Sequence, residues 1–246
     1  MRALMEKLLT GAPLSCAEYA GLIEQWQDAD AGALFAAARA ACDGTYGKDV
    51  YLRGLIEVSN YCKNDCRYCG IRRSNTRAER YRLAPDEILD CCARGYARGL
   101  RTFVLQGGED AWFTCERVES LVRQIKARYP DCAVTLSLGE HPKESYAAWR
   151  RAGADRYLLR HETADAAHYT RLHPAPLTLE NRMRCLRQLR EKVFVTTAPS
   201  SKLIQGPTST VTSDSSLILY ASWTCRVAPG FISASSFELS TPSTTV

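Results

Sequence analysis

The sequence predicts an α/β fold, a partial (βα) barrel of the TIM type. Apolar, strand-like runs alternate four times with helical segments between residues 49 and 191, and such alternation is typical of a parallel sheet with crossover helices. The runs are short and rich in β-branched or aromatic residues, as in strands that are covered on both faces. We expect an N-terminal helical cap at residues 1–48, the partial barrel at 49–191 and a tail at 192–246.

The elements follow one another in a simple order. Residues 1–48 are Ala-rich with amphipathic helical spacing that ends near Gly44. The expected strands span residues 51–59, 101–106, 133–138 and 156–161, and the expected helices span residues 85–98, 115–128, 143–151 and 179–190. Residues 193–197 have the composition of a fifth strand.

The tail differs from everything before it. Residues 192–246 contain 21 Ser or Thr among 55 residues and only five charged residues, a composition that fills a core poorly. We expect this tail to be disordered or non-native. The fourth strand would then lack an outer neighbour, which predicts an exposed sheet edge and low solubility.

Composition and charge exclude several classes of protein. The 246-residue chain has a formal net charge of +5, and its basic residues are scattered among acids, which predicts no nucleic-acid partner. It shows neither a signal peptide nor an apolar run of about eighteen residues, so we expect a cytoplasmic protein without a membrane span. The eleven cysteines are an odd number, which in a reducing compartment favours metal binding over disulfides.

The most informative motif is a cysteine triplet. Cys62, Cys66 and Cys69 form a Cys-x3-Cys-x2-Cys pattern directly after the first expected strand. Structural zinc sites take four protein donors and closed 4Fe-4S clusters take four cysteines, whereas three cysteines leave one iron of a 4Fe-4S cube open. The position after a strand places the triplet at the C-terminal rim, where barrel active sites form.

Two other interpretations of the triplet remain open. One is a zinc site with a distant fourth ligand, although zinc motifs usually come as paired Cys-x2-Cys units. The other is a non-catalytic iron–sulfur carrier or scaffold whose fourth ligand is Cys91 or Cys115.

Polar residues follow the other strands. Gly107, Gly108 and Glu109 come after the second strand, where glycines allow close backbone approach and a carboxylate can hold an ammonium group. Glu162 follows the fourth strand and, if buried, needs a partner such as a ribose diol or a cationic ligand. Arg182 opens the last expected helix and can meet a carboxylate, although a solvated position is more common for a helical arginine.

Aromatic and histidine side chains give weaker signals. Tyr68 precedes the third cysteine of the triplet, so it either packs the loop or lies against an adenine ring. His141, His168 and His173 are expected at the surface. No phosphate-binding loop, nucleophile elbow or dinucleotide-binding fingerprint occurs.

The triplet, the glycine pair and the βα array together resemble the radical S-adenosylmethionine (SAM) superfamily. More narrowly, several stretches resemble the HydE-type maturases of FeFe hydrogenases. These stretches are residues 57–62, 69–73, 80–82, 104–110, 135–140 and 154–163. Biotin synthase and methylornithine synthase share the triplet and the barrel. The resemblance runs from residue 1 to about 190 and stops inside a unit, which suggests a frameshifted or mis-assembled reading frame beyond it.

The resemblance implies an enzyme that reductively cleaves SAM at a 4Fe-4S cluster held by the three cysteines. It implies SAM contacts for a set of further residues: Tyr68, Gly107, Gly108, Glu109, Ser137, Glu162 and Arg182. It also implies an electron donor such as ferredoxin or flavodoxin, a small-molecule or iron-containing precursor as substrate, and other hydrogenase maturases as partners.

Overall fold

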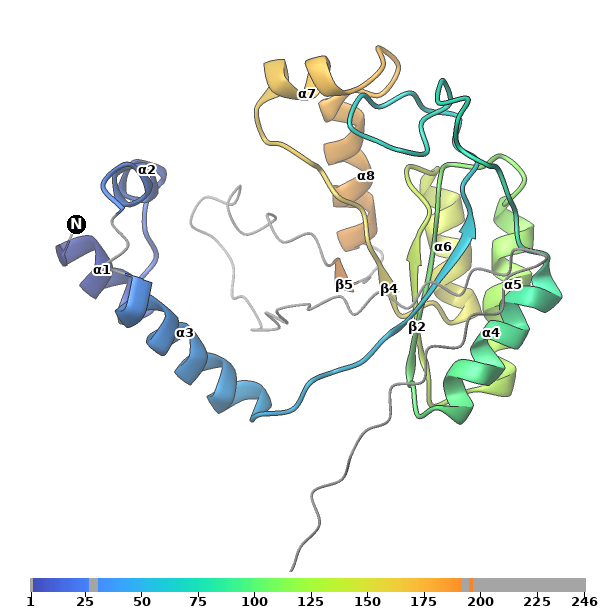
Figure 1. Ribbon diagram of the computed structural model, residues 1–246, viewed down its shortest axis with the longest axis horizontal. Helices are drawn as coiled ribbons and strands as arrows, with labels where there is room; N and C mark the ends of the chain where they lie inside the picture. The colour runs from blue at the N-terminus through green and yellow to red at the C-terminus, as the bar shows by residue number, and fades with distance from the viewer. Residues whose placement is uncertain (1, 27–30, 192–194, 197–246) are drawn as a thin grey trace, which may run out of the picture.

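The computed structural model describes residues 2–26, 31–191 and 195–196 (Figure 1). Its centre is a five-stranded sheet in the order β1-β2-β3-β4-β5, in which every neighbouring pair is parallel. The strands are β1 (Gly54–Ser59), β2 (Thr102–Gly107), β3 (Ala133–Ser137), β4 (Arg156–Tyr157) and β5 (Val195–Thr196). The predicted α/β fold, a partial parallel barrel, is confirmed.

Helices connect the strands. The eight helices of the described residues are α1 (Arg2–Leu9), α2 (Cys16–Glu24), α3 (Ala31–Tyr46), α4 (Pro85–Ala97), α5 (Cys115–Arg128), α6 (Lys143–Ala152), α7 (Ala166–Leu172) and α8 (Leu179–Glu191). Two helices of the barrel have favourable capping residues at their ends. Thr114 caps α5 by accepting a hydrogen bond from Arg117 N, and Gly153 ends α6 with a left-handed φ of 110°.

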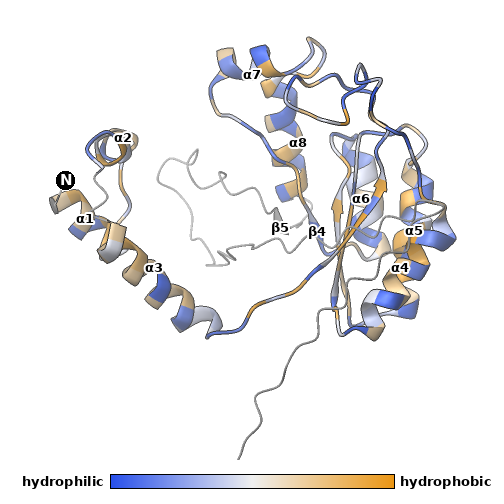
Figure 2. Cartoon of the chain, viewed as in Figure 1, coloured by the Kyte–Doolittle hydropathy of each residue, from blue (hydrophilic) through white to orange (hydrophobic). Residues whose placement is uncertain are grey.

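The main core lies between the sheet and helices α4, α5, α6 and α8. Alternate strand residues such as Phe103 and Leu105 point into it, and Figure 2 shows hydrophobic residues gathered on the strands and along α4 and α5. Trp149 of α6 is fully buried there, and its Nε1 donates to the Cys115 carbonyl at 3.0 Å. This core fixes the strands, and therefore the side chains at their carboxyl ends.

The N-terminal segment forms helices as expected, but in three pieces. Helices α1 and α2 bury a small cluster of Met5, Leu14 and Leu22, which is separate from the main core. Among its described residues α3 buries none, and Figure 1 shows α1–α3 lying apart from the sheet. The boundaries of the cap, partial barrel and tail stay a prediction, and the expected disorder of the tail falls outside the described residues.

Three expectations about the last strands need correction. The fourth strand, expected at residues 156–161, spans only Arg156–Tyr157 in the ladder, and the Arg160 carbonyl beyond it accepts a hydrogen bond from the Arg182 side chain. It does not lack an outer neighbour, since Arg156 and Tyr157 pair with Val195 and Thr196 of β5. Finally, α7 was not expected at all, although Asp165 caps it by accepting from His168 N.

Replacing Trp149 with alanine is expected to lower the free energy of unfolding by about 3–5 kcal/mol, because it leaves a cavity in the main core. Urea unfolding followed by circular dichroism measures the change. Phe35→Ala is the matched control, since Phe35 is 66% exposed and its loss should cost less than about 0.5 kcal/mol. Equal losses for the two variants would contradict the assignment of the core.

Candidate active site

The three cysteines of the triplet lie on the segment after β1, at the carboxyl end of the sheet. All three are half-buried free thiols. Burial raises the pKa of Cys66, and the charges of Cys62 and Cys69 raise it further; the resulting pKa is about 11. Binding to iron would stabilise the thiolate form of these side chains.

Three free thiols are the type of donor that a 4Fe-4S cluster takes from a protein. Within the residues that the structure describes, no group of three or more His, Cys, Asp or Glu side chains is arranged to hold one metal ion. A 4Fe-4S cube does not require such an arrangement, because each of its cysteines binds a different iron. Cys91 and Cys115, the alternative fourth ligands, pack against the main core.

One arginine holds the cysteine segment in shape. The Arg80 guanidinium donates to four main-chain carbonyls of this segment, those of Asn60 at 2.5 Å, Ile71 at 2.9 Å, Arg72 at 2.7 Å and Asn75 at 3.2 Å. A rigid guanidinium with five donors suits this task, and a lysine would not. These four hydrogen bonds therefore hold the segment in a compact loop, although it contains no helix or strand.

Gly108 brings the end of β2 against the same segment. A Cβ at this position would lie 2.2 Å from the Tyr61 carbonyl oxygen and 2.8 Å from Cys62 Cβ. Its N–H donates to the Ser59 carbonyl at 3.1 Å. The glycine pair therefore permits the close approach of two chain segments, and its expected contact with a ligand stays a prediction.

Glu109 is already engaged inside the protein. Its carboxylate is 8% exposed, Oε1 accepts from Glu140 N at 3.0 Å, and the Lys63 Nζ lies 3.1 Å from Oε2. Gly139, with φ of 85°, leaves room for it, because a Cβ there would lie 2.1 Å from Glu109 Cγ. Oε2 is buried and has no hydrogen-bond partner among the described residues, so the expectation that this carboxylate holds a ligand's ammonium group stays a prediction.

Glu140 continues this chain of contacts to Arg182. Glu140 Oε1 accepts from Arg182 Nε at 2.5 Å, and both side chains are 8% exposed. Asn181 donates to the other Glu140 oxygen, and Arg182 Nη1 donates to the Arg160 carbonyl. Two nitrogens of the Arg182 guanidinium, Nε and Nη1, are thus engaged. Nη2 makes no hydrogen bond with the described residues and is available to a ligand. Arg182 is therefore buried and paired, not solvated.

We call this series of contacts, Lys63–Glu109–Glu140–Arg182, the rim relay. It joins the carboxyl ends of β1, β2, β3 and β4 to the first turn of α8. An adjoining cavity of about 500 Å³ is lined by Lys63, Glu109, Glu140 and Asn181 together with residues of α6 and α8. The cysteines of the triplet, Tyr68, Ser137, Glu162 and Arg182 do not line this cavity.

Tyr68 is fixed by a histidine that was expected at the surface. The Tyr68 hydroxyl lies 2.9 Å from His173 Nε2, and His173 Nδ1 lies 2.9 Å from the Tyr169 carbonyl. Since a carbonyl only accepts, Nδ1 carries the hydrogen and Nε2 accepts from Tyr68. His173 is 6% exposed, so the surface expectation is wrong. His141 is also half-buried, and burial lowers its pKa; His168 is exposed as expected.

The chain turns sharply at Glu162, whose side chain is exposed. Its φ of 65° is the only positive value among the described non-glycine residues, and Thr163 N donates to the His161 carbonyl at 2.7 Å. This three-residue turn is strained, and such strain clusters at functional sites. His161 is buried, and neither of its ring nitrogens has a hydrogen-bond partner in the described chain.

Electrostatics brings several of the expected residues together. Burial raises the pKa of Tyr68 above its ordinary value, and the charges of Glu162 and Cys66 add to this while Arg182 opposes it. The charges of Cys66, Glu162 and Arg182 thus act on Tyr68, and the expectation that these residues bind one ligand stays a prediction. Ser137 ends β3 beside Gln106, and its expected ligand contact stays a prediction.

The sequence profile of the Radical SAM superfamily matches residues 56–199. The chain belongs to the radical SAM superfamily. The expected superfamily is confirmed, and so is the expectation that the chain is an enzyme. The profile begins within β1 and includes the cysteine triplet, the rim relay and α7.

Two curated relatives show which radical SAM proteins the chain resembles in sequence. The chain is 44% identical to the FeFe hydrogenase maturase subunit HydE of Thermotoga maritima over 162 residues, 66% of this chain and 46% of the relative. It is 29% identical to 3-methylornithine synthase of Methanosarcina acetivorans over 169 residues, 68% of this chain and 48% of the relative. The chain thus spans about half the length of the curated relatives it matches.

Solved radical SAM structures agree with the fold. Methylornithine synthase (PylB) superposes with a TM-score of 0.71 at 26% identity, covering 78% of this chain and 57% of that one. The hydrogenase maturase HydG superposes with a TM-score of 0.68 at 22% identity, covering 77% of this chain and 43% of that one. None of the helices in the described parts is long and apolar enough to cross a membrane.

Three residues of the site were not expected. Glu140 lies in a recognised stretch, but its ion pair is invisible in the sequence because Arg182 is far along the chain. His173 and Lys63 were missed for the same reason. The only available signal was local: Lys63 is adjacent to a cysteine of the triplet, and Glu140 follows a strand-end glycine.

Replacing Arg80 with alanine is expected to release the cysteine segment and lower the free energy of unfolding by more than about 2 kcal/mol, because four carbonyls lose a charged donor. Iron bound per chain after anaerobic reconstitution should fall, and amide hydrogen exchange should rise across residues 60–81. Arg77→Ala, which removes an exposed guanidinium from the same segment, should change neither. Unaltered exchange in Arg80→Ala would refute this role.

Replacing Glu140 with alanine is expected to cost about 3–5 kcal/mol of stability, because it leaves the Arg182 charge buried and unpaired. Glu144→Ala, at an exposed position lining the same cavity, should be close to neutral. Adding Arg182→Met to Glu140→Ala should recover part of the loss in urea unfolding. If the double variant shows simple addition of two losses, the pair does not behave as a buried ion pair.

Proposed function

We propose that the chain is a radical SAM protein of the HydE type, which cleaves SAM reductively in the maturation of FeFe hydrogenase. The observation that carries the proposal is the half-buried cysteine triplet on the segment after β1, which Arg80 holds at the carboxyl end of the sheet. A three-cysteine segment, a fixed aromatic ring and a buried guanidinium meet at the carboxyl end of a parallel sheet, where ligands bind in such folds.

The residues suit the groups that they would hold. Cys62, Cys66 and Cys69 would bind a 4Fe-4S cluster, which when reduced supplies the electron that breaks the sulfonium bond of SAM. Arg182, held by Glu140, would present its free nitrogen to a carboxylate. Glu162 would accept from ribose hydroxyls, and Ser137 would contribute a further hydrogen bond.

The remaining residues orient the ligand and limit solvent access. Tyr68 would lie against the adenine, with its ring held in place by His173. The main chain at Gly107 and Gly108 would accept from the amino group of the methionine portion. Glu109 Oε1 accepts from Glu140 N, and its buried Oε2, which has no hydrogen-bond partner in the described chain, would accept from the same amino group.

Sequence identity favours HydE over the other relatives. It reaches 44% with HydE, against 33% with a biotin synthase of Cutibacterium acnes and 29% with 3-methylornithine synthase. The substrate would be a small-molecule or iron-containing precursor, and other hydrogenase maturases would be partners. A non-catalytic iron–sulfur carrier is the alternative of a different class.

Anaerobic reconstitution with iron and sulfide, followed by electron paramagnetic resonance, tests the proposal. We expect a reduced 4Fe-4S signal that shifts when SAM is added, together with formation of 5'-deoxyadenosine. Cys66→Ala should lose the signal. Arg182→Lys should keep it but weaken SAM binding by more than about tenfold, because a lysine cannot replace the paired guanidinium.

Each other outcome points to a different protein. A cluster signal that SAM does not shift would indicate the electron carrier. Zinc uptake without iron uptake would indicate a structural metal site. Restored hydrogenase activity in a host that lacks HydE would support the maturation role, whereas restored biotin or methylornithine synthesis would replace it.

A further inference from the structure

An aspartate joins the two ends of the cysteine segment. Ser59 precedes the triplet at the end of β1 and Arg82 follows it, and the two residues form an isolated antiparallel bridge. The Asp110 carboxylate contacts both of them. Its Oδ2 accepts from Ser59 Oγ at 2.7 Å and from Arg82 Nε at 2.6 Å, and its Oδ1 accepts from Arg82 Nη2 at 2.9 Å. Such a bidentate pair is strong and directional, so one side chain closes the segment where it begins and ends.

Asp110 also belongs to the turn after β2. Its N–H donates to the Gly108 carbonyl at 2.8 Å. The turn itself lies against the start of the segment, because Gly108 N donates to the Ser59 carbonyl at 3.1 Å and Lys63 N donates to the Glu109 carbonyl at 3.0 Å. Asp110 therefore links the segment that would bind the cluster to the turn that would hold the amino group of SAM.

The Asp110 carboxylate has no acceptor site left for a ligand. Its Oδ1 also accepts from Trp112 N at 3.0 Å, so four hydrogen bonds use the about four lone-pair sites of a carboxylate. The side chain is 5% exposed. Burial opposes ionisation, but the hydrogen bonds from Arg82, Ser59 and Trp112 outweigh it and hold the pKa of Asp110 below its ordinary value. Asp110 is thus an internal, charged contact and not a ligand-binding group.

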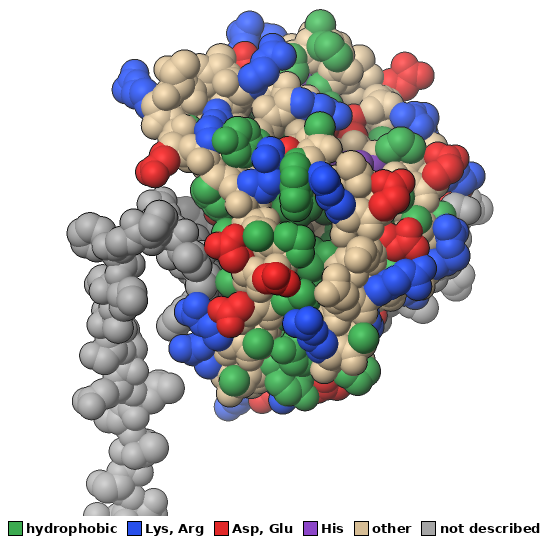
Figure 3. Space-filling view, turned by 90° about the vertical axis from the view of Figure 1, so that its right-hand side faces the viewer, with side chains coloured by type: hydrophobic (Ala, Val, Ile, Leu, Met, Phe, Trp, Pro, Cys, Tyr) green, Lys and Arg blue, Asp and Glu red, His purple; other side chains and the backbone are tan. Residues whose placement is uncertain are grey.

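Aromatic rings hold Arg82 in the orientation that Asp110 requires. The Arg82 Cζ lies 4.5 Å from the ring centroid of Tyr61, which precedes Cys62, and 5.5 Å from that of Trp112. Arg117 packs on the same Trp112 ring at 4.3 Å. Figure 3 shows Lys and Arg side chains interspersed with hydrophobic ones over the upper part of this face, the level at which Figure 1 shows the cysteine segment. Cation–π contacts of this kind limit rotation of the guanidinium.

We propose that Asp110 is a positioning residue, which fixes the cysteine segment relative to the turn after β2 and thereby sets the affinity for SAM. This inference rests on the proposed function, in which SAM contacts both the cluster that the segment would hold and the turn. A ligand that two chain segments hold together binds most tightly when the relative position of the segments is fixed before it arrives.

The role of Asp110 differs from that of Arg80. Arg80 donates to four carbonyls that all lie within the segment, so it shapes the segment itself. Asp110 joins the ends of the segment to a different strand. Loss of Arg80 should therefore reduce cluster binding, whereas loss of Asp110 should leave the cluster in place and weaken the binding of SAM.

The test uses the full chain, anaerobically reconstituted, and the variant Asp110→Asn, which keeps the shape of the side chain but removes its charge. Equilibrium dialysis with the oxidised chain measures the dissociation constant for SAM without turnover. We expect it to rise on the order of tenfold, while iron per chain and the electron paramagnetic resonance signal without SAM stay as in the wild type. Arg82→Gln should act likewise. The double variant should bind no more than about twofold more weakly than either single variant, because both break one contact.

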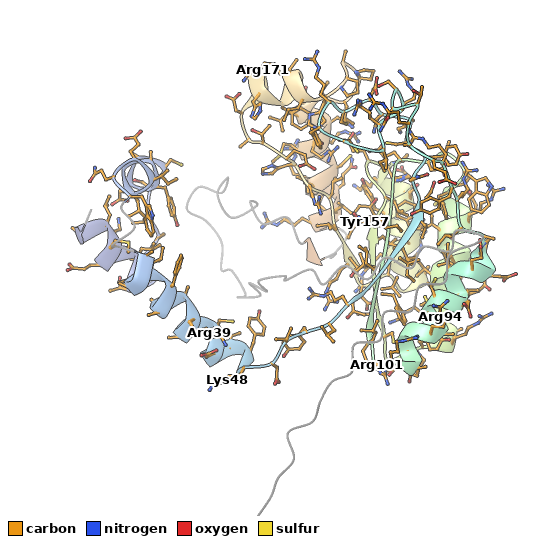
Figure 4. All side chains as sticks on the ribbon, viewed as in Figure 1. Arg39, Lys48, Arg94, Arg101, Tyr157 and Arg171 are labelled. Carbon is orange, nitrogen blue, oxygen red and sulfur yellow. The ribbon has the colours of Figure 1, made fainter. Side chains whose placement is uncertain are left out.

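A matched control removes a similar ion pair elsewhere. Arg101 Nε lies 3.0 Å from Asp131 Oδ2, and the Arg101 Cζ also packs on an aromatic ring, 3.9 Å from the centroid of Tyr96. In Figure 4, Arg101 lies at the end of the sheet opposite to the cysteine segment. Asp131→Asn should therefore leave the SAM dissociation constant and the iron content as in the wild type.

A measurement on the full chain without a cluster tests the positioning by itself. In Asp110→Asn, amide hydrogen exchange should rise at residues 59–62 and at residues 107–112 together, because the contact joins these two stretches, and should not change at residues 143–152. If the wild type binds iron but not SAM, the proposed function fails, yet hydrogen exchange still tests whether Asp110 joins the stretches. If circular dichroism shows that Asp110→Asn does not fold, Ser59→Ala replaces it. This variant removes one of the four hydrogen bonds and should raise the dissociation constant about threefold.

Three results would overturn the positioning proposal. One is a SAM dissociation constant that is equal in the Asp110→Asn and Asp131→Asn variants. Another is the loss of iron from a folded Asp110→Asn variant, which would show that the contact retains the cluster itself. The third is hydrogen exchange that rises in one of the two stretches alone, since the contact would then not connect them.

Discussion

The buried ion pair between Glu140 and Arg182 is the interaction on which the site depends. Removing two charges from water is expensive, and the pair is supported by Asn181, which donates to Glu140, and by the Arg160 carbonyl, which accepts from Arg182. The same contacts tie α8 to the ends of β3 and β4. A single network therefore both closes the upper edge of the sheet and orients the arginine that we assign to SAM binding.

The rim relay also explains two glycines that look like turn formers in the sequence. Gly139 has a left-handed φ, and its missing side chain makes room for the Glu109 carboxylate. Gly108 allows the end of β2 to touch the chain beside Cys62. Both glycines act in packing, by letting charged and cluster-binding segments approach closely. Any effect of these glycines on ligand binding follows from this close packing.

Some arginines of the cysteine segment stabilise its fold, and others lie at the surface. Arg80 replaces a regular hydrogen-bond ladder by donating to four carbonyls, which holds the irregular loop that carries the three cysteines. Neighbouring arginines remain in solvent. The segment therefore contains both half-buried cysteines and exposed arginines.

The sequence by itself determined the alternating fold, the cysteine triplet and the family, because strand–helix periodicity and ligand spacing are local properties of the chain. It also placed Tyr68, Glu162 and Arg182 in order along the strands. Only the tertiary structure decided what each of them touches. The Glu140–Arg182 pair, the His173 partner of Tyr68 and the short β4 join residues far apart in the chain, and burial, which gives these contacts their strength, is set by the packed core and not by neighbouring residues.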